Sequence, residues 1–556
     1  MTVPTSLLAQ TILQSCKAYG VEDIIISPGS RNAPLTLGFT GDSSFRTMSV
    51  VDERCAAFFA LGIAQQKKKP VVLVCTSGSA LLNYFPAIAE AYYSRIPLIV
   101  LSADRPKHLV DNGDGQTINQ SGVFQSHVCA EEDLILTDEL EKNTINVDIC
   151  KKVLSNCIAH SRPVHLNIPF DEPLYLTLPH YDIRLEDVKH EDKPVAKLVS
   201  DAFKQIWRQS SKKMILIGCM APNTLSKEQI DHLANDPSII VLTESTSNVH
   251  HPNFFNHIDQ LISSFSVADS ERFRPDLLVT MGGLVISKKI KTLFRQYQPE
   301  SHWHIDQLEA LDTYFCLKKH FKMSPDQFFE QVYAEKNNVE SSYKNWVRAT
   351  HLDRLIQHED YLAAIPFSDL KAFDLLFKSL PQNIQLQMGN SSTIRYMQLF
   401  QSDPSIDVYC NRGTSGIDGS LSTAIGAATV ANKPVLCVLG DLSFFYDSNA
   451  LWQDHTPTNF KIIVINNGGG GIFRILPGPK NTITYDRYFE TTHQLTAKQL
   501  AKMHGFSYYS AKSAGSLKRK LRRLFKPCDK PMLLEIFTPR KQNDQILLQY
   551  FNHFKS

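Results

Sequence analysis

Short runs of apolar residues recur along this chain and alternate with longer segments in which apolar residues follow a helical period. The runs are 24–26, 71–75, 98–102 and 164–168, then 214–218, 239–243 and 277–281, and finally runs that start at 384, 408, 435, 462 and 532. Continuous apolar runs of this length are typical of strands that a parallel sheet buries on both faces. Their alternation with helical segments predicts an α/β protein built on parallel sheets.

Two polar segments divide these runs into three groups. One is 185–194, and the other is 333–359, which we expect to be helical. The pattern therefore predicts three α/β domains, at 1–184, 195–335 and 360–556. The first and third domains each contain a strand, a glycine turn and then a helix, around 71–79 and 435–443. This likeness indicates either a shared topology or a feature that α/β folds have in general.

The composition fits a large globular protein and excludes other classes. Hydrophobic residues make up 43% of the 556 residues, which is enough for several buried cores. The 58 basic and 56 acidic residues are mixed along the chain, so there is no basic stripe for nucleic acid. The 11 cysteines form no Cys-x-x-Cys pair, and no signal peptide or membrane-spanning run is visible. We therefore expect a cytoplasmic protein without stable membrane insertion.

Two of the apolar runs end in residues that suit a hard cation. The run at 435–439 is followed by Gly440 and Asp441, and the run at 462–465 by two asparagines and four glycines. Ligands bind outside the carboxyl ends of parallel strands, so Asp441 and Asn467 should meet at one sheet edge. A carboxylate oxygen, an amide oxygen and a carbonyl of the glycine loop would give Mg²⁺ three ligands. Taken singly, each element also fits an ordinary helix cap or loop.

Polar turns also follow strands of the first domain. The turn at 27–35 presents Ser30 and Arg31, Arg105 follows another apolar run, and Gln116 lies in a flexible polar loop. A carboxylate would suit the backbone donors at Ser30 and Arg31, Arg105 belongs at the ligand-bearing edge of the sheet, and Gln116 could hydrogen-bond a substrate or a cofactor. An exposed helix start and a surface loop are the plain structural alternatives.

Two further segments of the first domain have both a chemical and a structural interpretation. Thr76, Ser77 and Gly78, followed by Asn83, form a glycine turn whose hydroxyl and amide groups could contact a ligand. Capping of the next helix by Ser77 or Ser79 explains the same residues. Glu53 stands where a strand gives way to an apolar helix, where an acid also complements the helix dipole.

Cationic residues occur at several turns that lie far apart in the sequence. Each of them alone fits an exposed surface residue. Together they are hard to explain in a nearly neutral protein unless the substrate carries several negative charges. The set consists of Arg31, Arg105, Arg395 and Arg412, with Lys288 and Lys289 in the central domain.

Together these segments resemble the 2-succinyl-5-enolpyruvyl-6-hydroxy-3-cyclohexene-1-carboxylate synthases of menaquinone biosynthesis, which are thiamine-diphosphate-dependent enzymes. The resemblance spans nearly the whole chain and is most specific at the turns 27–35 and 411–419. In the central domain it rests on the Ser-Lys-Lys at 287–289. Leu442 stands where many other thiamine enzymes carry glycine, and it points to this branch. The stretch 480–492 matches no pattern of the family.

The resemblance implies a cofactor, a reaction and a subunit arrangement. Thiamine diphosphate, with Mg²⁺ or Mn²⁺, would lie between a pyrimidine-binding first domain of one subunit and a diphosphate-binding third domain of another. The protein would be a homodimer or a homotetramer. It would decarboxylate 2-oxoglutarate and add the resulting succinyl semialdehyde carbanion to isochorismate. Glu53 would act as the catalytic residue at the aminopyrimidine ring, which requires a partly desolvated carboxyl with a raised pKa.

The resemblance also implies roles for individual residues. The metal would be bound by Asp441, Asn467 and the carbonyl of Gly469. The cofactor would also contact Thr76, Ser77, Gly78, Asn83, Gly389, Asn390, Ser391, Gly416, Ile417, Gly440, Leu442, Ser443, Gly470 and Ile472. The carboxylates of 2-oxoglutarate would meet Ser391, Arg395 and Arg412. Isochorismate would meet Ser30, Arg31, Arg105, Gln116, Lys288 and Lys289, beside a water-excluding wall of Ile472, Phe473 and Leu476.

Other interpretations compete with this one. A different thiamine enzyme, such as a 2-oxo acid decarboxylase or an acetolactate-synthase-like carboligase, would have less use for so many cations. A nonenzymatic binding protein would have no need of Glu53, which is present. A nucleotide-binding module would more naturally show Gly-x-x-x-x-Gly-Lys-Ser or Gly-x-Gly-x-x-Gly after its first strand, and neither occurs there.

Overall fold

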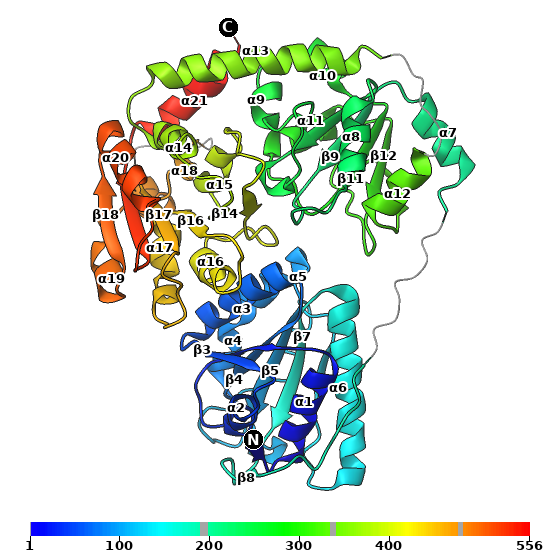
Figure 1. Cartoon of the computed structure of the whole chain (residues 1–556), viewed down its shortest axis with the longest axis vertical. Helices are drawn as coiled ribbons and strands as arrows, with labels where there is room; N and C mark the ends of the chain where they lie inside the picture. The colour runs from blue at the N-terminus through cyan, green and yellow to red at the C-terminus, as the bar shows by residue number, and fades with distance from the viewer. Residues whose placement is uncertain (1, 189–197, 334–340, 476–481, 556) are drawn as a thin grey trace.

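The computed structural model describes residues 2–188, 198–333, 341–475 and 482–555. The chain forms three α/β bodies, each built on a parallel sheet, as Figure 1 shows. The predicted fold class is therefore confirmed. Within the described ranges, no helix combines the length and the apolar character that a membrane span requires.

The amino-terminal body contains a sheet of six parallel strands in the order β3-β2-β4-β5-β7-β6. These strands are β2 (Asp23–Ile26), β3 (Arg46–Ser49), β4 (Val71–Cys75), β5 (Leu98–Asp104), β6 (Glu131–Asp133) and β7 (Val164–Pro169). On one face pack α3 (Glu53–Lys67), α4 (Ser79–Asn83) and α5 (Phe85–Ser94). On the other face pack α1 (Leu7–Ala18), α2 (Ala33–Gly41) and α6 (Leu140–His160). A small antiparallel pair joins β1 (Val3–Pro4) to β8 (Thr177–Leu178).

The central body has five parallel strands in the order β10-β9-β11-β12-β13. They are β9 (Lys213–Ile217), β10 (Ile239–Thr243), β11 (Leu277–Met281), β12 (Ser301–Ile305) and β13 (Leu317–Phe321). Its helices are α7 (Asp201–Gln209), α8 (Lys227–Asn235), α9 (Ile258–Ile262), α10 (Val267–Phe273), α11 (Lys288–Gln296) and α12 (Pro325–Val332). The helix expected in the second polar segment is α13 (Tyr343–Ala364), which runs from this body to the carboxyl-terminal one (Figure 1).

The carboxyl-terminal body again has six parallel strands, in the order β15-β14-β16-β17-β19-β18. They are β14 (Gln385–Met388), β15 (Asp407–Tyr409), β16 (Val435–Gly440), β17 (Lys461–Asn466), β18 (Ser507–Ala511) and β19 (Met532–Phe537). The helices are α14 (Asp369–Phe377), α15 (Ser392–Met397), α16 (Ser420–Ala428), α17 (Asp441–Tyr446), α18 (Ile472–Ile475), α19 (Lys498–Met503), α20 (Ala514–Leu524) and α21 (Asn543–His553).

The two six-stranded sheets share one topology. Numbered along each body, both sheets have the strand order 2-1-3-4-6-5. The glycine turns noted in the sequence follow equivalent third strands, β4 and β16, so the likeness reflects a common topology rather than a general α/β feature. Apolar runs did not mark the sheet strands β3, β6, β12, β13 and β18. They carry charged or polar residues, and four of them lie at a sheet edge with β12 beside one, whereas the edge strand β10 is apolar and buried.

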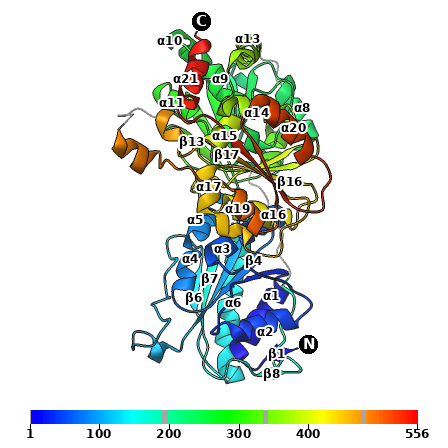
Figure 2. The same ribbon diagram turned by 90° about the vertical axis from the view of Figure 1, so that its left-hand side faces the viewer.

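The amino- and carboxyl-terminal bodies pack against each other through α3 and α16, which lie side by side in Figures 1 and 2. Residues of both helices belong to one buried apolar cluster. Glycines allow the close approach: a Cβ on Gly62 would lie 2.1 Å from the carbonyl oxygen of Thr423, and one on Gly426 would lie 2.0 Å from that of Phe59. This packing fixes the position of Glu53, the first residue of α3, relative to the carboxyl-terminal body.

Candidate functional site

A pocket of about 180 Å³ lies at the carboxyl ends of β14, β16 and β17. The parallel register brings these strand ends to one sheet edge, as the sequence predicts. Twelve of the predicted cofactor and substrate residues line it, namely Asn390, Ser391, Ile417, Gly440, Asp441, Leu442, Ser443, Asn467, Gly469, Gly470, Ile472 and Phe473. The expectation that Asp441 and Asn467 meet in one crevice is therefore confirmed.

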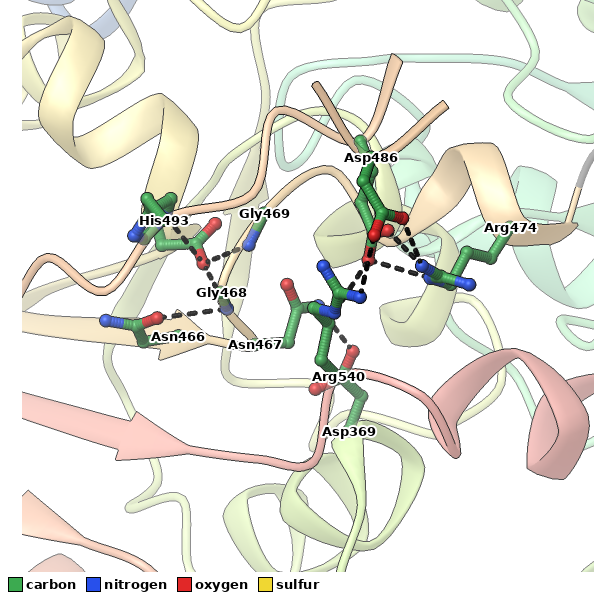
Figure 3. A network of polar contacts seen from close by, with 11 residues as sticks. Asp369, Asn466, Asn467, Gly468, Gly469, Arg474, Asp486, His493 and Arg540 are labelled. Carbon is green, nitrogen blue, oxygen red and sulfur yellow. Dashed lines mark hydrogen bonds and ion pairs between the residues drawn. The ribbon is translucent and has the colours of Figure 1, made fainter. Parts of the chain in front are cut away.

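Asp441 is buried where β16 passes into α17. Its Oδ1 accepts a hydrogen bond from its neighbour's amide, that of Leu442, at 2.7 Å. Its Oδ2 accepts from the amides of Gly468 at 2.9 Å and Gly469 at 3.0 Å, and lies 3.2 Å from Nε2 of His493 (Figure 3). The carboxylate is thus fixed against the glycine loop by converging N–H donors.

The amide of Asn467 is oriented by Asp369, at the start of α14. Nδ2 of Asn467 donates to Oδ2 of Asp369 at 2.9 Å, which leaves the amide oxygen of Asn467 available to a cation. Thr538 donates to the other oxygen of Asp369 at 2.5 Å. Burial raises the pKa of Asp369 to about 6. No sequence signal pointed to Asp369, because it lies 98 residues before its partner and in another element.

These residues fit a divalent cation and a diphosphate. A Cβ on Gly469 would lie 2.6 Å from the carbonyl oxygen of Glu490, so only glycine lets the loop pass this closely. The available donors are a carboxylate, an amide oxygen and backbone carbonyls, which is the oxygen set that Mg²⁺ prefers. The described residues contain no cluster of three or more His, Cys, Asp or Glu side chains that could hold a metal. A site here would therefore depend on backbone and amide oxygens beside the carboxylate of Asp441.

The segment from 482 to 493, for which the sequence suggested no role, packs on the glycine loop. The amide of Gly470 donates to the carbonyl of Glu490 at 2.6 Å, and the amide of His493 donates to the carbonyl of Gly468 at 3.1 Å. The buried Glu490 carboxylate forms a bidentate ion pair with Arg474 of α18. Asp486 links Arg474 to Arg540, as Figure 3 shows. Leu476, assigned to the apolar wall, lies outside the described residues.

The turn at 411–419 forms one side of the pocket. Nδ2 of Asn390 donates to the carbonyls of Asn411 and Gly416, both at 2.7 Å, and Oδ1 of Asn390 accepts from Arg412 at 2.8 Å. Ser443 donates to the carbonyl of Ile417 at 2.6 Å, and the Ile417 side chain remains 38% exposed. Two predicted cofactor residues, Gly389 and Gly416, lie beside the pocket without lining it.

Arg395 and Arg412 are close enough to affect each other. Arg395 donates to the carbonyl of Ser391 at 2.7 Å, and its pKa is lowered by burial and by the charge of Arg412. Neither arginine lines the pocket of Asp441, and Arg412 instead lines a larger cavity of about 550 Å³ among the three bodies. Two half-buried guanidinium groups whose charges affect each other favour a bound anion.

Glu53 lies in a different, shallow pocket with Asn83, Pro28 and Trp452. Burial raises the pKa of its carboxyl, as proton-transfer chemistry requires. Asp52 is the N-cap of α3, so Glu53 also occupies the first helical turn that the structural alternative describes. This pocket shares no residue with the pocket of Asp441. Within one chain, the two halves of the predicted cofactor site are separate.

The turn at 76–80 is not a serine cap. The N-cap of α4 is Gly78, at φ 87°, and no side chain caps this helix, so capping by Ser77 or Ser79 is wrong. The amide of Gly78 instead donates to Oε1 of Gln120 at 2.7 Å. Oγ1 of Thr76 is buried without a hydrogen-bond partner among the described residues. A buried polar atom in that condition suits a hydrogen bond to a ligand.

The remaining predicted substrate residues do not line the pocket of Asp441. Arg31 is buried and donates to the carbonyl of Phe170 at 3.1 Å, whereas Ser30 and Gln116 are exposed. Arg105 donates to the carbonyl of Gly115 at 3.2 Å. Lys288 and Lys289 begin α11, where Nζ of Lys289 lies 3.3 Å from the ring centroid of Phe551 and burial lowers its pKa to about 8. Their assignment to isochorismate stays a prediction.

Comparison with known proteins gives three successive family matches. They are "Thiamine pyrophosphate enzyme, N-terminal TPP binding domain" over residues 7–126, "Middle domain of thiamine pyrophosphate" over 186–386, and "Thiamine pyrophosphate enzyme, C-terminal TPP binding domain" over 388–536. A protein from Flavobacterium psychrophilum is 51% identical over 555 residues, which cover 100% of both chains. Proteins from Flavobacterium johnsoniae and Christiangramia forsetii are 50% and 47% identical, each with 99% of both chains covered. All three are named 2-succinyl-5-enolpyruvyl-6-hydroxy-3-cyclohexene-1-carboxylate synthase.

Proposed function

Because this chain belongs to the 2-succinyl-5-enolpyruvyl-6-hydroxy-3-cyclohexene-1-carboxylate synthases, a family of thiamine pyrophosphate enzymes, we propose that it catalyses that synthesis in menaquinone formation. The reaction decarboxylates 2-oxoglutarate and adds the succinyl semialdehyde unit to isochorismate. The observation that carries the proposal is the single pocket that collects Asp441, Asn467 and the glycine loop beside Ser391 and Ile417. Another thiamine enzyme, whose 2-oxo acid carries a single carboxylate, would have less use for both Arg395 and Arg412.

The cofactor and metal sites follow from this pocket. Asp441, Asn467 and the carbonyl of Gly469 would hold Mg²⁺ or Mn²⁺, and the neighbouring loop would hold the diphosphate. Bound thiamine diphosphate supplies the electron sink that decarboxylation of a 2-oxo acid requires. Glu53 would hold a proton against a ring nitrogen of the aminopyrimidine, a role that its half-buried carboxyl and raised pKa support.

Substrate recognition is assigned to the cationic turns. Arg395 and Arg412 would bind the carboxylates of 2-oxoglutarate, and their mutual proximity supports an anionic ligand there. Ile472 and Phe473 would keep water from the reacting carbon. Isochorismate would be bound by residues of the first and central domains, namely Ser30, Arg31, Arg105, Gln116, Lys288 and Lys289.

A complete site would need two chains. Glu53 and Asp441 lie in separate pockets of one chain, which supports a homodimer or homotetramer in which Glu53 of one subunit faces Asp441 of another. We also propose that the enzyme works in the cytoplasm, since all 11 cysteines are free thiols.

One assay tests the proposal. Purified protein with thiamine diphosphate, Mg²⁺ and 2-oxoglutarate should consume isochorismate and release carbon dioxide, and Glu53→Gln should lose most of this activity while still binding the cofactor. Release of carbon dioxide with isochorismate untouched would overturn the specific reaction. Absence of cofactor binding in calorimetry would overturn the enzyme class.

A further inference from the structure

Glu90, in α5 of the amino-terminal body, binds the Arg412 turn of the carboxyl-terminal body. Its Oε1 accepts the amide of Gly413 at 2.7 Å, and its Oε2 accepts the amide of Thr414 at 2.7 Å and the hydroxyl of the same threonine at 2.8 Å. A fourth donor is Ser94, at 2.6 Å, from its own helix. Three of the four hydrogen bonds on this carboxylate therefore come from one turn more than 300 residues away.

The contact is tight and buried. Glu90 is 1% exposed and forms no ion pair within the described ranges of the chain, so its charge is balanced by neutral donors. A Cβ on Gly413 would lie 2.5 Å from the carbonyl oxygen of Glu90 and 3.0 Å from Oε1, which explains the glycine after Arg412. A buried carboxylate without a cation is costly unless hydrogen bonds replace its lost hydration, and four donors do so at Glu90.

Arg412 lies between two fixed partners. Glu90 holds the two residues that follow it, and Asn390 accepts a hydrogen bond from its guanidinium at 2.8 Å. The side chain of Asn390 also binds the turn at Asn411 and Gly416, so both ends of the turn are held. The direction of the Arg412 side chain therefore depends on a contact with another domain.

A second buried carboxylate binds the turn before Lys288 in the same way. The buried carboxylate of Glu244 accepts the successive amides of Ile286 and Ser287, both at 2.7 Å, directly before Lys288. Each of these two carboxylates binds two adjacent backbone amides directly beside a basic residue. The shared pattern indicates that they position the basic side chains. This recurrence argues against an accidental contact at Glu90.

We propose that Glu90 is a positioning residue that sets the guanidinium of Arg412 against a carboxylate of the substrate, so that recognition of 2-oxoglutarate depends on docking of the amino-terminal domain. The inference rests on the proposed function, in which Arg412 binds that substrate. Glu90 touches neither substrate nor cofactor and acts only through the turn.

A double-mutant cycle tests this inference in the full-length enzyme. Glu90→Gln keeps one acceptor oxygen but turns an NH₂ group toward an amide donor, so it should raise the KM for 2-oxoglutarate about tenfold with kcat within about threefold. Thr414→Val, which removes only the hydroxyl bond, should give a smaller rise and guards against misfolding of the first variant. Ser94→Ala is the matched control, since it removes a donor to the same carboxylate outside the turn, and its KM should stay within about twofold.

The decisive variant combines Glu90→Gln with Arg412→Ala. If Glu90 acts through Arg412, the KM of the double variant should equal that of Arg412→Ala alone. A further rise in KM in the double variant, or an unchanged KM in both Glu90→Gln and Thr414→Val, would overturn the inference. Failure of the proposed function is a separate result, because the unmodified enzyme would then turn over no 2-oxoglutarate with isochorismate.

Discussion

Asn449 of the carboxyl-terminal domain donates a hydrogen bond of 2.8 Å to Oδ2 of Asp52, the residue directly before Glu53. The other oxygen of Asp52 caps α3 by accepting the amide of Cys55 at 3.2 Å. On the far side of Glu53, Arg54 donates to the carbonyl of Tyr446 at 2.8 Å. The end of α17 and the segment after it thus hold the turn on both sides of Glu53.

Loss of the Asn449 contact should therefore slow catalysis without changing substrate affinity. We expect Asn449→Ala to lower kcat about tenfold with little change in KM, because a misplaced carboxyl transfers protons poorly. Asn156→Ala is the control, since the partly exposed Asn156 side chain bonds only to its own helix. A kcat within about twofold of the unmodified enzyme would show that the Asn449 contact is not needed to place Glu53.

The Asp369 contact should determine metal affinity. In Asp369→Asn the new amide can no longer force the oxygen of Asn467 toward a cation, so the Mg²⁺ concentration needed for half-maximal activity should rise at least about tenfold. Titration of the thiamine-diphosphate-loaded enzyme with Mg²⁺ after chelation measures this. Asp353→Asn, at an exposed position of α13, should leave the titration unchanged. An unchanged titration in Asp369→Asn would contradict the orienting role.

Buried histidines should make the protein sensitive to acid. His257, His351 and His358 join α9 to α13 and, through Tyr550, to α21, and burial lowers the pKa of His351 and of His358 to about 4. In the unfolded chain a histidine takes up a proton near pH 6.5, so stability is fully present above that pH and falls as the pH drops toward 4. At pH 5, His351 and His358 should each lower the free energy of unfolding by about 2 kcal/mol relative to neutral pH.

Thermal unfolding between pH 7.5 and 5 checks this. His351→Phe should reduce the loss of melting temperature on acidification, because it removes one proton-binding site from the unfolded state. His160→Phe, at an exposed position of α6, should leave the pH dependence as it is. Equal pH dependence in all three proteins would show that other groups govern acid unfolding.

Two glycine substitutions should have opposite effects on stability. Gly62→Ala places a Cβ 2.1 Å from the carbonyl of Thr423 and should lower the free energy of unfolding by about 2 kcal/mol or more, as overpacked cores do. Gly515→Ala, in α20, adds a Cβ that meets no atom of the described residues within 4 Å beyond its chain neighbours and its own helix backbone, so it should be neutral or stabilise by up to about 1 kcal/mol. Calorimetry of both variants measures the difference. A Gly62→Ala variant as stable as Gly515→Ala would mean that α3 and α16 can separate at no cost.

The pattern of apolar and polar residues is sufficient to predict the fold class, most of the strands and the residues at the strand ends of the carboxyl-terminal domain. Mainly apolar runs such as Val71–Cys75 and Ile239–Thr243 coincide with strands. A strand of a sheet that is covered on both faces buries the side chains on both faces, and such side chains are mostly apolar. The residues directly after such a strand must lie at the sheet edge. That local rule is why Asp441 and Asn467 were expected in one pocket, and why the turns with Arg395 and Arg412 were found.

How these groups are held in place depends on contacts between segments that are distant in the chain. Asp369 orients Asn467 across 98 residues, Glu90 holds Gly413 across 323, and Asn449 holds Asp52 across 397. No period or motif marks such partners, because each contact exists only after α3 packs on α16 or α14 packs beside the sheet. Local burial, which the sequence encodes directly, determines which groups lie at strand ends. Their orientation depends on hydrogen bonds between distant segments, and those are set by packing.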